Sequence, residues 1–321
     1  MIPVPRNNPA PLAAILHRVA ASLLLTALLF LGACQSPAPP PFPTRTAPSP
    51  PAAPSFAQAS YPAPSVPAFG SSSIPKAPHP SISARAAIVI HANTGTVLYQ
   101  KNADIHLPVA STQKLMMALV LVEAGNMGKN VRVAASDTQV EPANMGLKTG
   151  ENYRKDDLLR AVLVRSSNDI AHCLARDHSG SESAFGYLMT QRARSLGMNN
   201  SIFKTASGLP APGQYSTARD LSILAAAAMR QPFIRQTVGT KSLTFRFADG
   251  HTKVIKNTNK VLLGYPYCTG MKTGYTRAAG KCLVSSATHN GRNVIVVILG
   301  SKIPTIWDES RALLHWGLDL S

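Results

Sequence analysis

One stretch of this sequence constrains the fold more than any other. Residues 115–122 read Leu-Met-Met-Ala-Leu-Val-Leu-Val, with no charged or polar side chain among them. Such a run predicts a buried helix, and Gly125 shortly after it suits a helix end. Pro108 cannot continue the helix backwards, so the helix is predicted to begin near Ser111, at its electropositive end.

A serine and a lysine stand at the head of this predicted helix. Ser111 and Lys114 are three residues apart, so their side chains share one face. A serine hydroxyl is a weak nucleophile unless a base takes its proton, and a lysine is such a base only when it is neutral. Burial and a second cation nearby would lower the pKa of the lysine in that direction. The pair is therefore a candidate nucleophile and base.

The Ser-x-x-Lys pattern is common by accident and also occurs at Ser73/Lys76 and Ser201/Lys204. The first of these lies in a proline-rich tract, and the second follows a turn-like stretch, residues 197–200. Only Ser111 opens a long apolar helix, which favours it as the functional copy.

Residues 1–34 predict an export signal. Basic residues precede an apolar run, residues 19–31, that is too short to span a bilayer. The run ends in Leu31-Gly32-Ala33-Cys34, which resembles the lipobox of bacterial lipoproteins. The resemblance implies that Cys34 is lipidated, and several acyl chains anchor a protein stably. An ordinary secretory signal with an incidental cysteine is the alternative.

The resemblance also implies a location. In lipoproteins a residue other than aspartate after the cysteine, here Gln35, favours sorting to the outer membrane. The expected place is the periplasmic side of the cell envelope. Residues 35–82 are rich in Pro, Ala and Ser and predict a disordered, semi-rigid linker, because they cannot bury enough surface to fold. Residues 83–321 remain for the folded catalytic domain.

The folded part reads as an α/β (α+β) domain. A hairpin is expected from residues 85–90 and 97–100, and the chain ends in strands and a last helix at 307–316. Helices are expected between these ends, at 158–164, 169–176, 183–196 and 217–229, and further strands at 242–247, 251–255, 281–287 and 294–300. This order predicts an antiparallel sheet of about five strands from both chain ends, flanked by helices, with an all-helical subdomain inserted.

Two further motifs carry polar chemistry. Ser166-x-Asn168 follows the helix 158–164, and on local grounds it could simply begin the next helix, where Ser and Asn are favoured. Lys-Thr-Gly occurs at 148–150, in a polar loop region, and at 272–274, ahead of a strong strand. We interpret the first copy as a decoy. At the second, a cation, a hydroxyl and Gly274 on a strand edge could hold a carboxylate and an extended peptide.

The order Ser-x-x-Lys, Ser-x-Asn, Lys-Thr-Gly resembles the three active-site motifs of serine penicillin-binding proteins and β-lactamases. The surroundings are closer to the low-molecular-mass D-alanyl-D-alanine carboxypeptidases. Residues 146–151 and 207–220 are similar to stretches that those enzymes carry, and the resemblance covers about 83–320. It implies the fold of the β-lactamase/penicillin-binding transpeptidase class.

The resemblance implies a role for each matching residue. Ser111 would be the acylated nucleophile and Lys114 its general base. Ser166 would relay a proton to the leaving amine, and Asn168 would hold the substrate amide and Lys114. Substrate binding would fall to the second Lys-Thr-Gly motif and its neighbour, namely Lys272, Thr273, Gly274 and Tyr275, with the backbone N–H groups of Ser111 and Tyr275 as the oxyanion hole.

The expected substrates are peptidoglycan stem peptides, with β-lactams as covalent inhibitors; no metal or cofactor is expected. Two positions depart from the family. Thr269 stands where many relatives have aspartate, and only Lys302 lies near the place of an arginine that helps to bind the substrate carboxylate. Both departures concern substrate preference rather than acylation.

Other functions remain as alternatives. A D,D-endopeptidase of cross-links would use the same residues, and a penicillin-binding protein with little turnover would retain the motifs. A β-lactamase is less favoured, because no Glu-x-x-Leu-Asn pattern follows. The formal net charge of +17 would suit anionic partners, but no nucleic-acid-binding motif is present, so no nucleic-acid partner is expected. The oligomeric state is left open.

Three cysteines remain after Cys34. Cys173 is expected in the core, and a disulfide between Cys268 and Cys282 is doubtful, because they would be out of register in a hairpin turning near Arg277.

Overall fold

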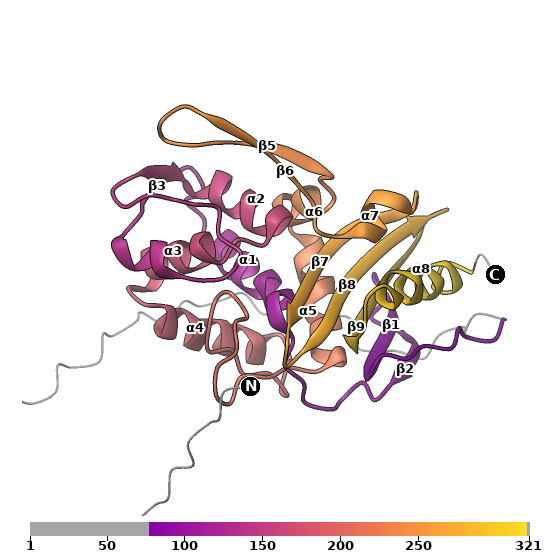
Figure 1. The fold of residues 1–321 in the computed structure, drawn as a ribbon. Coiled ribbons are helices and arrows are strands. Elements are labelled where there is room, and N and C mark those ends of the chain that lie inside the picture. The colour runs from indigo at the N-terminus through magenta and orange to yellow at the C-terminus, as the bar shows by residue number, and fades with distance from the viewer. Residues whose placement is uncertain (1–76, 320–321) are drawn as a thin grey trace, which may run out of the picture. The chain divides into compact units, whose positions relative to one another are not determined.

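Both ends of the folded chain build one antiparallel sheet (Figure 1). The structure, a computed structural model, describes residues 77–319, so the predicted signal, the lipobox and most of the predicted linker lie outside the described residues. The strand order is β2-β1-β9-β8-β7. Its strands are β1 (Ala86–His91), β2 (Val97–Lys101), β7 (Cys268–Thr276), β8 (Gly280–His289) and β9 (Arg292–Ser301). The predicted five-stranded sheet from both chain ends is confirmed.

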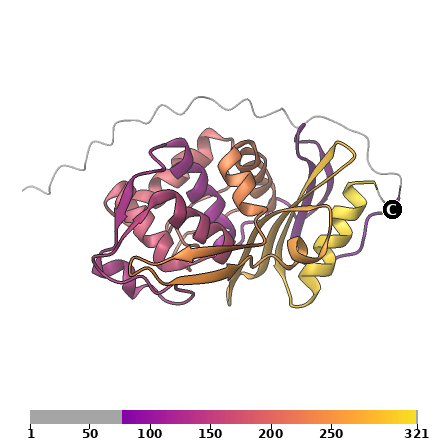
Figure 2. The same cartoon turned by 90° about the horizontal axis from the view of Figure 1, so that it is seen from above.

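The central strands are buried on both faces. In β1, Ile88 and Ile90 belong to one apolar core, whereas Ala87 and Val89 belong to another. This alternation follows from the two-residue period of a strand, and it requires cover on each face. Helix α5 (Ala218–Arg230) packs into the first core and helix α8 (Thr305–Gly317) into the second. Figure 2 shows the sheet between these two layers.

The segment between β2 and β7 forms the helical part of the molecule. Besides α5, it contains α1 (Lys114–Glu123), α2 (Lys155–Arg165), α3 (Asn168–Ser179), α4 (Glu182–Ser195), α6 (Pro232–Val238) and α7 (Lys260–Gly264). The segment is not purely helical, which differs from the predicted all-helical insert. Two small antiparallel sheets lie in it, β3 (Asn130–Arg132) with β4 (Asn152–Arg154), and β5 (Ser242–Arg246) with β6 (Thr252–Lys256). The strands β3 and β4 were not predicted, because short strands in polar loops carry little apolar pattern in the sequence.

The apolar stretch is buried along most of its length, as its composition predicts. Residues 114–121 are all buried within α1. The helix does not begin as an α-helix at Ser111, because residues Ala110–Gln113 form a separate 3-10 turn, η1. Ala110 has a left-handed φ of 50°, and the hydroxyl of Thr112 donates to the Val109 carbonyl at 2.7 Å. The nucleophile candidate therefore stands on a tight turn and Lys114 starts the helix.

The folded unit begins before the predicted boundary at residue 83. The indole N–H of Trp316 donates to the Ala77 carbonyl at 2.8 Å, and the Lys101 ammonium donates to the Ile82 carbonyl at 2.8 Å. Residues 77–82 therefore lie against the sheet and α8 instead of continuing the linker. Within residues 77–319, every helix is too short or too polar to cross a bilayer.

Candidate active site

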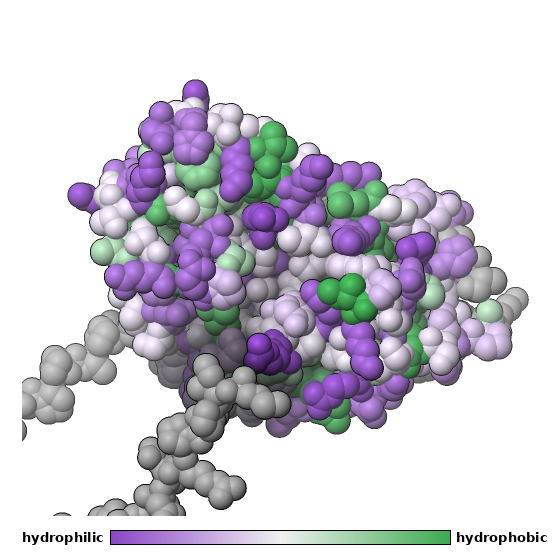
Figure 3. All heavy atoms as spheres, in the orientation of Figure 1, coloured by the Kyte–Doolittle hydropathy of each residue, from purple (hydrophilic) through white to green (hydrophobic). Residues whose placement is uncertain are grey.

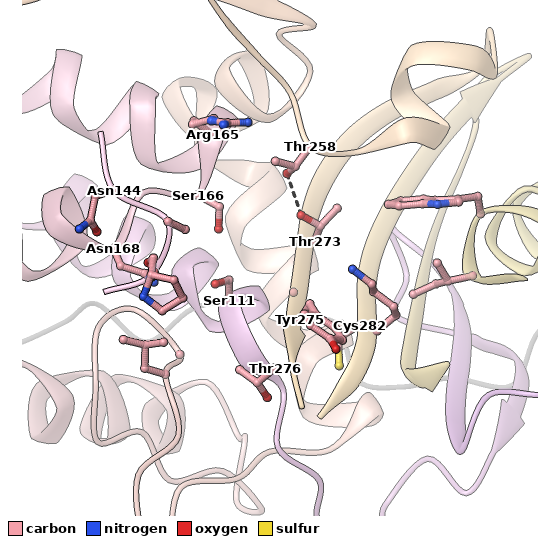
Figure 4. Close-up of a pocket in the computed structure, with 18 residues that line it drawn as sticks. Ser111, Asn144, Arg165, Ser166, Asn168, Thr258, Thr273, Tyr275, Thr276 and Cys282 are labelled. Carbon is pink, nitrogen blue, oxygen red and sulfur yellow. Dashed lines mark hydrogen bonds between the residues drawn. The ribbon is translucent and has the colours of Figure 1, made fainter. Parts of the chain in front are cut away.

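A cavity of about 420 Å³ opens where the helical part meets the edge strand β7. Figure 3 shows this face of the molecule as mainly hydrophilic, with small and separate hydrophobic patches. Six of the eight predicted catalytic and substrate-binding residues line the cavity (Figure 4), namely Ser111, Ser166, Asn168, Thr273, Gly274 and Tyr275. The other two, Lys114 and Lys272, are almost fully buried. The fold thus gathers residues that are far apart in the chain.

The side chain of Lys114 lies among three oxygen atoms. Its Nζ is 2.6 Å from Asn168 Oδ1, 2.7 Å from the Ser207 carbonyl oxygen and 2.9 Å from Ser111 Oγ. A neutral amine has two N–H donors and one lone pair, and the two shorter contacts are to oxygens that can only accept. Neutral Lys114 would therefore direct its lone pair at the Ser111 hydroxyl.

The surroundings favour this neutral form. Burial, followed by the positive charge of Lys272, lowers the pKa of Lys114 well below its usual value, although the carboxylates of Glu182 and Asp169 oppose this. Burial also lowers the pKa of Lys272 to about 7. Desolvation disfavours the charged form of an amine, and two cations close together disfavour each other. The neutral form of Lys114 is thus favoured, and Lys272 changes its charge near neutral pH.

The junction between α2 and α3 presents the second motif. Ser166 ends α2 in the left-handed conformation, with φ 71°, and Ser167 rather than Ser166 is the N-cap of α3. The Asn168 amide donates to the Pro142 carbonyl at 2.6 Å, which turns its Oδ1 towards Lys114. Ser166 and Asn168 therefore have a place in the cavity that a simple helix cap would not give them.

Two glycines let the backbone pack closely around Ser111. A Cβ on Gly274 would lie 2.9 Å from the Val109 carbonyl oxygen and 3.0 Å from the Ser111 nitrogen. A Cβ on Gly208 would lie 2.2 Å from the Ala110 carbonyl oxygen. Strand β7 and the 207–209 loop consequently touch the nucleophile turn from two sides, and Gly274 is needed for this approach.

The other copies of the short motifs lie elsewhere. Lys148 is on the surface, with 70% of its side chain exposed, and pairs with Asp249 at 3.5 Å. Ser201 is buried and bonds to Ser216 and Asp220, while Lys204 is exposed. Ser73 and Lys76 lie outside the described residues. Among the described copies, one of each motif reaches the cavity.

The departures and the cysteines have simple structural places. Thr269 bonds to Ser286 through their hydroxyls at 2.7 Å. Lys302 is exposed and does not line the cavity. Cys173, Cys268 and Cys282 are buried and free, and Cys282 pairs in register with Gly274 rather than with Cys268. The doubtful disulfide is therefore absent among the described residues.

Sequence reasoning missed three parts of the site. The Ser207 carbonyl contacts both Lys114 and Ser111, but a backbone oxygen has no sequence signal. Asp169 accepts backbone N–H groups of Met145 and Gly146 at 2.8 and 3.0 Å, and so holds the loop that contains Pro142. Thr258 lies on the cavity wall. In residues 77–319 we find no group of three His, Cys, Asp or Glu side chains that could hold a metal ion.

A buried lysine whose neutral form is favoured, bonded to a serine hydroxyl that faces a cavity, defines a serine hydrolase with a lysine base. Residues 73–303 match the peptidase family S11, described as D-alanyl-D-alanine carboxypeptidase. The chain therefore belongs to this family of serine peptidases, as the order of its three motifs predicted.

Individual relatives agree with this membership. The chain is 34% identical to the D-alanyl-D-alanine carboxypeptidase DacF of Bacillus subtilis, over 69% of this chain and 58% of the relative, so it spans little more than half of that protein. It is 33% identical to a D-alanyl-D-alanine endopeptidase of Pseudomonas aeruginosa, over 68% and 71% of the two chains. A crystal structure of a D-alanyl-D-alanine carboxypeptidase from Mycobacterium tuberculosis superposes with a TM-score of 0.73, at 33% identity, over 78% of this chain and 97% of that one. The predicted fold class is confirmed.

Proposed function

We propose that this protein is a D,D-carboxypeptidase that removes the terminal D-alanine from peptidoglycan pentapeptides through an acyl-enzyme on Ser111. The observation that carries the proposal is the contact of 2.9 Å between Lys114 Nζ and Ser111 Oγ, made by a lysine whose burial and cationic neighbour disfavour its charge. Ser201, which also begins a Ser-x-x-Lys pattern, bonds instead to Ser216 and Asp220.

Acylation would begin with proton transfer from Ser111 to Lys114. The Ser111 oxygen attacks the carbonyl carbon of the penultimate D-alanine, and the carbonyl π electrons move to its oxygen. The backbone N–H groups of Ser111 and Tyr275 would stabilise that oxyanion, because Gly274 brings β7 against the nucleophile turn.

Collapse of this intermediate would break the peptide bond. The carbonyl re-forms, the C–N bond cleaves, and the leaving amine takes a proton from Lys114 through the Ser166 hydroxyl. Ser166 and Ser111 line the same cavity, and Lys114 bonds to Ser111. Water then adds to the ester carbonyl, Lys114 accepts a proton from that water, and the Ser111 hydroxyl re-forms as the shortened peptide leaves.

The strand β7 would hold the substrate. Lys272 is buried and would supply positive potential to the cavity. The hydroxyl of Thr273 faces the cavity and would donate to the terminal carboxylate. Asn168 would accept the amide N–H of the substrate in addition to holding Lys114. β-Lactams would acylate Ser111 by the same steps and persist as esters.

The test uses the full-length protein and a fluorescent penicillin, with the labelled peptide identified by mass spectrometry. We expect label on Ser111, none in Ser111→Ala, and release of D-alanine from a pentapeptide. Lys148→Ala should label almost as the natural protein does, whereas Lys272→Ala should lose most of its labelling. An absence of label on Ser111, or the reverse effect of the two lysines, would refute the assignment.

A D,D-endopeptidase is the second candidate, because a relative with that name matches as strongly in identity as the carboxypeptidases do. The same residues would then cleave the D-alanyl cross-link of a muropeptide. Release of D-alanine from the pentapeptide but not cleavage of the cross-link supports the first proposal, and the opposite result supports the second. Label without either reaction would indicate a penicillin-binding protein with little turnover.

The location of the enzyme is a further part of the proposal. Residues 1–34 would direct export, Cys34 would carry the lipid, and a linker from residue 35 would hold the catalytic domain away from an envelope membrane, with the outer membrane favoured by Gln35. The substrate chemistry requires the periplasmic side, where peptidoglycan lies. Replacement of Cys34 by Ala should release the protein from sedimented membranes; a variant that still sediments would contradict the anchor.

A further inference from the structure

One end of the active-site cavity is built from three segments that are distant in the chain. The backbone N–H of Thr258 donates to the Val164 carbonyl at 3.2 Å, at the end of α2. The hydroxyl of Thr258 lies 2.7 Å from the hydroxyl of Thr273. Arg165 follows Val164 directly and lines the same cavity as both threonines. Figure 4 shows Arg165, Thr258 and Thr273 together at this end.

The two hydroxyls leave one donor unused. A hydroxyl has one proton to donate, and a pair of hydroxyls shares a single hydrogen bond, so either Thr258 or Thr273 keeps a free proton. The backbone bond to Val164 holds Thr258 in place. This free donor is therefore prepositioned for an acceptor that enters the cavity.

A cation lines the same end of the cavity as this donor. Arg165 is exposed, and its guanidinium makes no ion pair or hydrogen bond with other residues of the 77–319 unit. Lys281 also lines the cavity, but its side chain has a partner. Its Nζ lies over the ring of Tyr275, 4.1 Å from the ring centre. An unengaged guanidinium beside a free hydroxyl suits a carboxylate, which an arginine can hold through two parallel hydrogen bonds.

We propose that Arg165 is the cation that binds the free carboxylate of the substrate, and that Thr258 positions the Thr273 hydroxyl for the same carboxylate. This inference rests on the proposed function and names a specificity determinant for it. Lys302, the basic residue near the place of the family's arginine, is exposed and stands outside the cavity lining. The cation would then come from the end of α2 rather than from the segment before α8.

The experiment compares benzylpenicillin with its methyl ester, which lacks the carboxylate charge, as acylating agents of Ser111 in the full-length protein. Arg165→Gln should lower the second-order acylation constant for the free acid about ten- to a hundredfold, the range for a lost charge-assisted hydrogen bond. The constant for the methyl ester should change less than about twofold. Arg165→Lys should restore part of the loss, because it keeps the charge without the paired donors.

Matched variants separate binding from structural damage. Lys302→Ala should leave both constants unchanged. Thr258→Val removes a hydroxyl at nearly constant shape and should weaken acylation by the free acid selectively, whereas Thr258→Ser should restore it. An equal loss for acid and ester in Arg165→Gln would show a structural effect and overturn the inference, as would a selective loss of the free-acid reaction in Lys281→Ala but not in Arg165→Gln.

The peptide reaction gives a second readout. In Arg165→Gln the KM for a pentapeptide should rise more than its kcat falls, because the carboxylate is bound before and during the reaction. If the natural protein is not acylated on Ser111 at all, the proposed function itself fails. If the natural protein is acylated and Arg165→Gln reacts with both penicillin reagents as the natural protein does, only the inference about Arg165 fails.

Discussion

Two buried lysines at the active site have opposite requirements for their protons. Lys114 works as a base only when neutral, whereas Lys272 attracts a carboxylate only when charged. Burial lowers the pKa of both, and the charge of Lys272 lowers that of Lys114 further. Because the two groups interact, the pKa values seen in kinetics belong to the pair.

The pH profile of acylation should therefore be bell-shaped. As pH rises, Lys114 loses its proton and the rate rises; as pH passes about 7, Lys272 loses its charge and the rate for carboxylate-bearing substrates falls. The measurement is the pH dependence of the second-order acylation constant by benzylpenicillin. Lys272→Arg should remove the falling limb, since an arginine stays charged. A falling limb that persists unchanged in Lys272→Arg would refute this assignment.

Gly274 offers a test of how closely β7 must approach the nucleophile. In Gly274→Ala the new methyl group would press on the Val109 carbonyl and the Ser111 N–H, so acylation should fall by about a hundredfold or more, as small misplacements of reacting groups do. Gly264→Ala, where a Cβ meets nothing within 4 Å, is the matched control and should retain acylation. Equal rates in both variants would mean that the close approach is not required.

At the scale of elements, a buried carboxylate joins η2 (Ala135–Gln139) to α3. Asp137 is fully buried and accepts from Arg176 at 2.8 Å and from His172 at 2.8 Å. Burial opposes its charge, but the bonds from His172, Arg176 and the Ala134 N–H bring the pKa of Asp137 well below its usual range. The bond to Asp137 raises the pKa of His172. This cluster holds the turn that leads into the cavity loop.

The stability of the cluster depends on pH from both sides. A carboxyl group whose pKa is lowered by folding stabilises the fold above the unfolded pKa of about 4. This contribution is lost as pH falls towards the folded pKa. A histidine whose pKa is raised by folding stabilises the fold below the unfolded pKa of about 6.5. This contribution is lost as pH rises through the folded pKa. Both contributions are present together at roughly pH 4 to 6.5.

Asp137→Asn should lower the free energy of unfolding by about 2–4 kcal/mol in that window, because it leaves Arg176 without its buried partner. Urea unfolding at pH 5.5 measures this. Asp249→Asn, at a half-exposed carboxylate, should lower the stability much less than Asp137→Asn, because solvent screens its ion pair. Similar losses in the two variants would show that the cluster contributes no more than a surface pair.

At the scale of the whole molecule, Glu309 of α8 ties the beginning of the folded chain to its end. Its carboxylate is buried and accepts from the backbone of Ser83 and Ala84, and from the Ser301 hydroxyl at 2.6 Å. Because β1 and β9 are neighbours in the sheet, loss of this tie affects both ends together.

Glu309→Ala should therefore lower the global free energy of unfolding by about 2–3 kcal/mol, since it leaves buried donors unpaired. Thermal or urea unfolding should still show a single transition. The neighbouring variant Asp308→Ala removes a carboxylate with 71% exposure and should change stability by less than about 0.5 kcal/mol. A separate early transition in Glu309→Ala would show that the two chain ends do not fold as one unit.

The sequence by itself determined the chemistry of the site and the class of the fold. Ser111 and Lys114 share a helix face through local spacing, the apolar run had to be buried, and strand patterns at both chain ends required one sheet. These are short-range signals, which is why they could be read directly. The order of the three motifs also pointed to the family before any geometry was available.

Only the tertiary structure decided how these parts meet. The Ser207 carbonyl beside Lys114, the bond of Thr258 to Thr273 and the place of Arg165 rather than Lys302 at the cavity all arise from contacts between distant segments. Backbone carbonyls are the same in every residue, and the packing of distant segments depends on the whole core. Such contacts therefore leave no local pattern in the sequence from which they could be predicted.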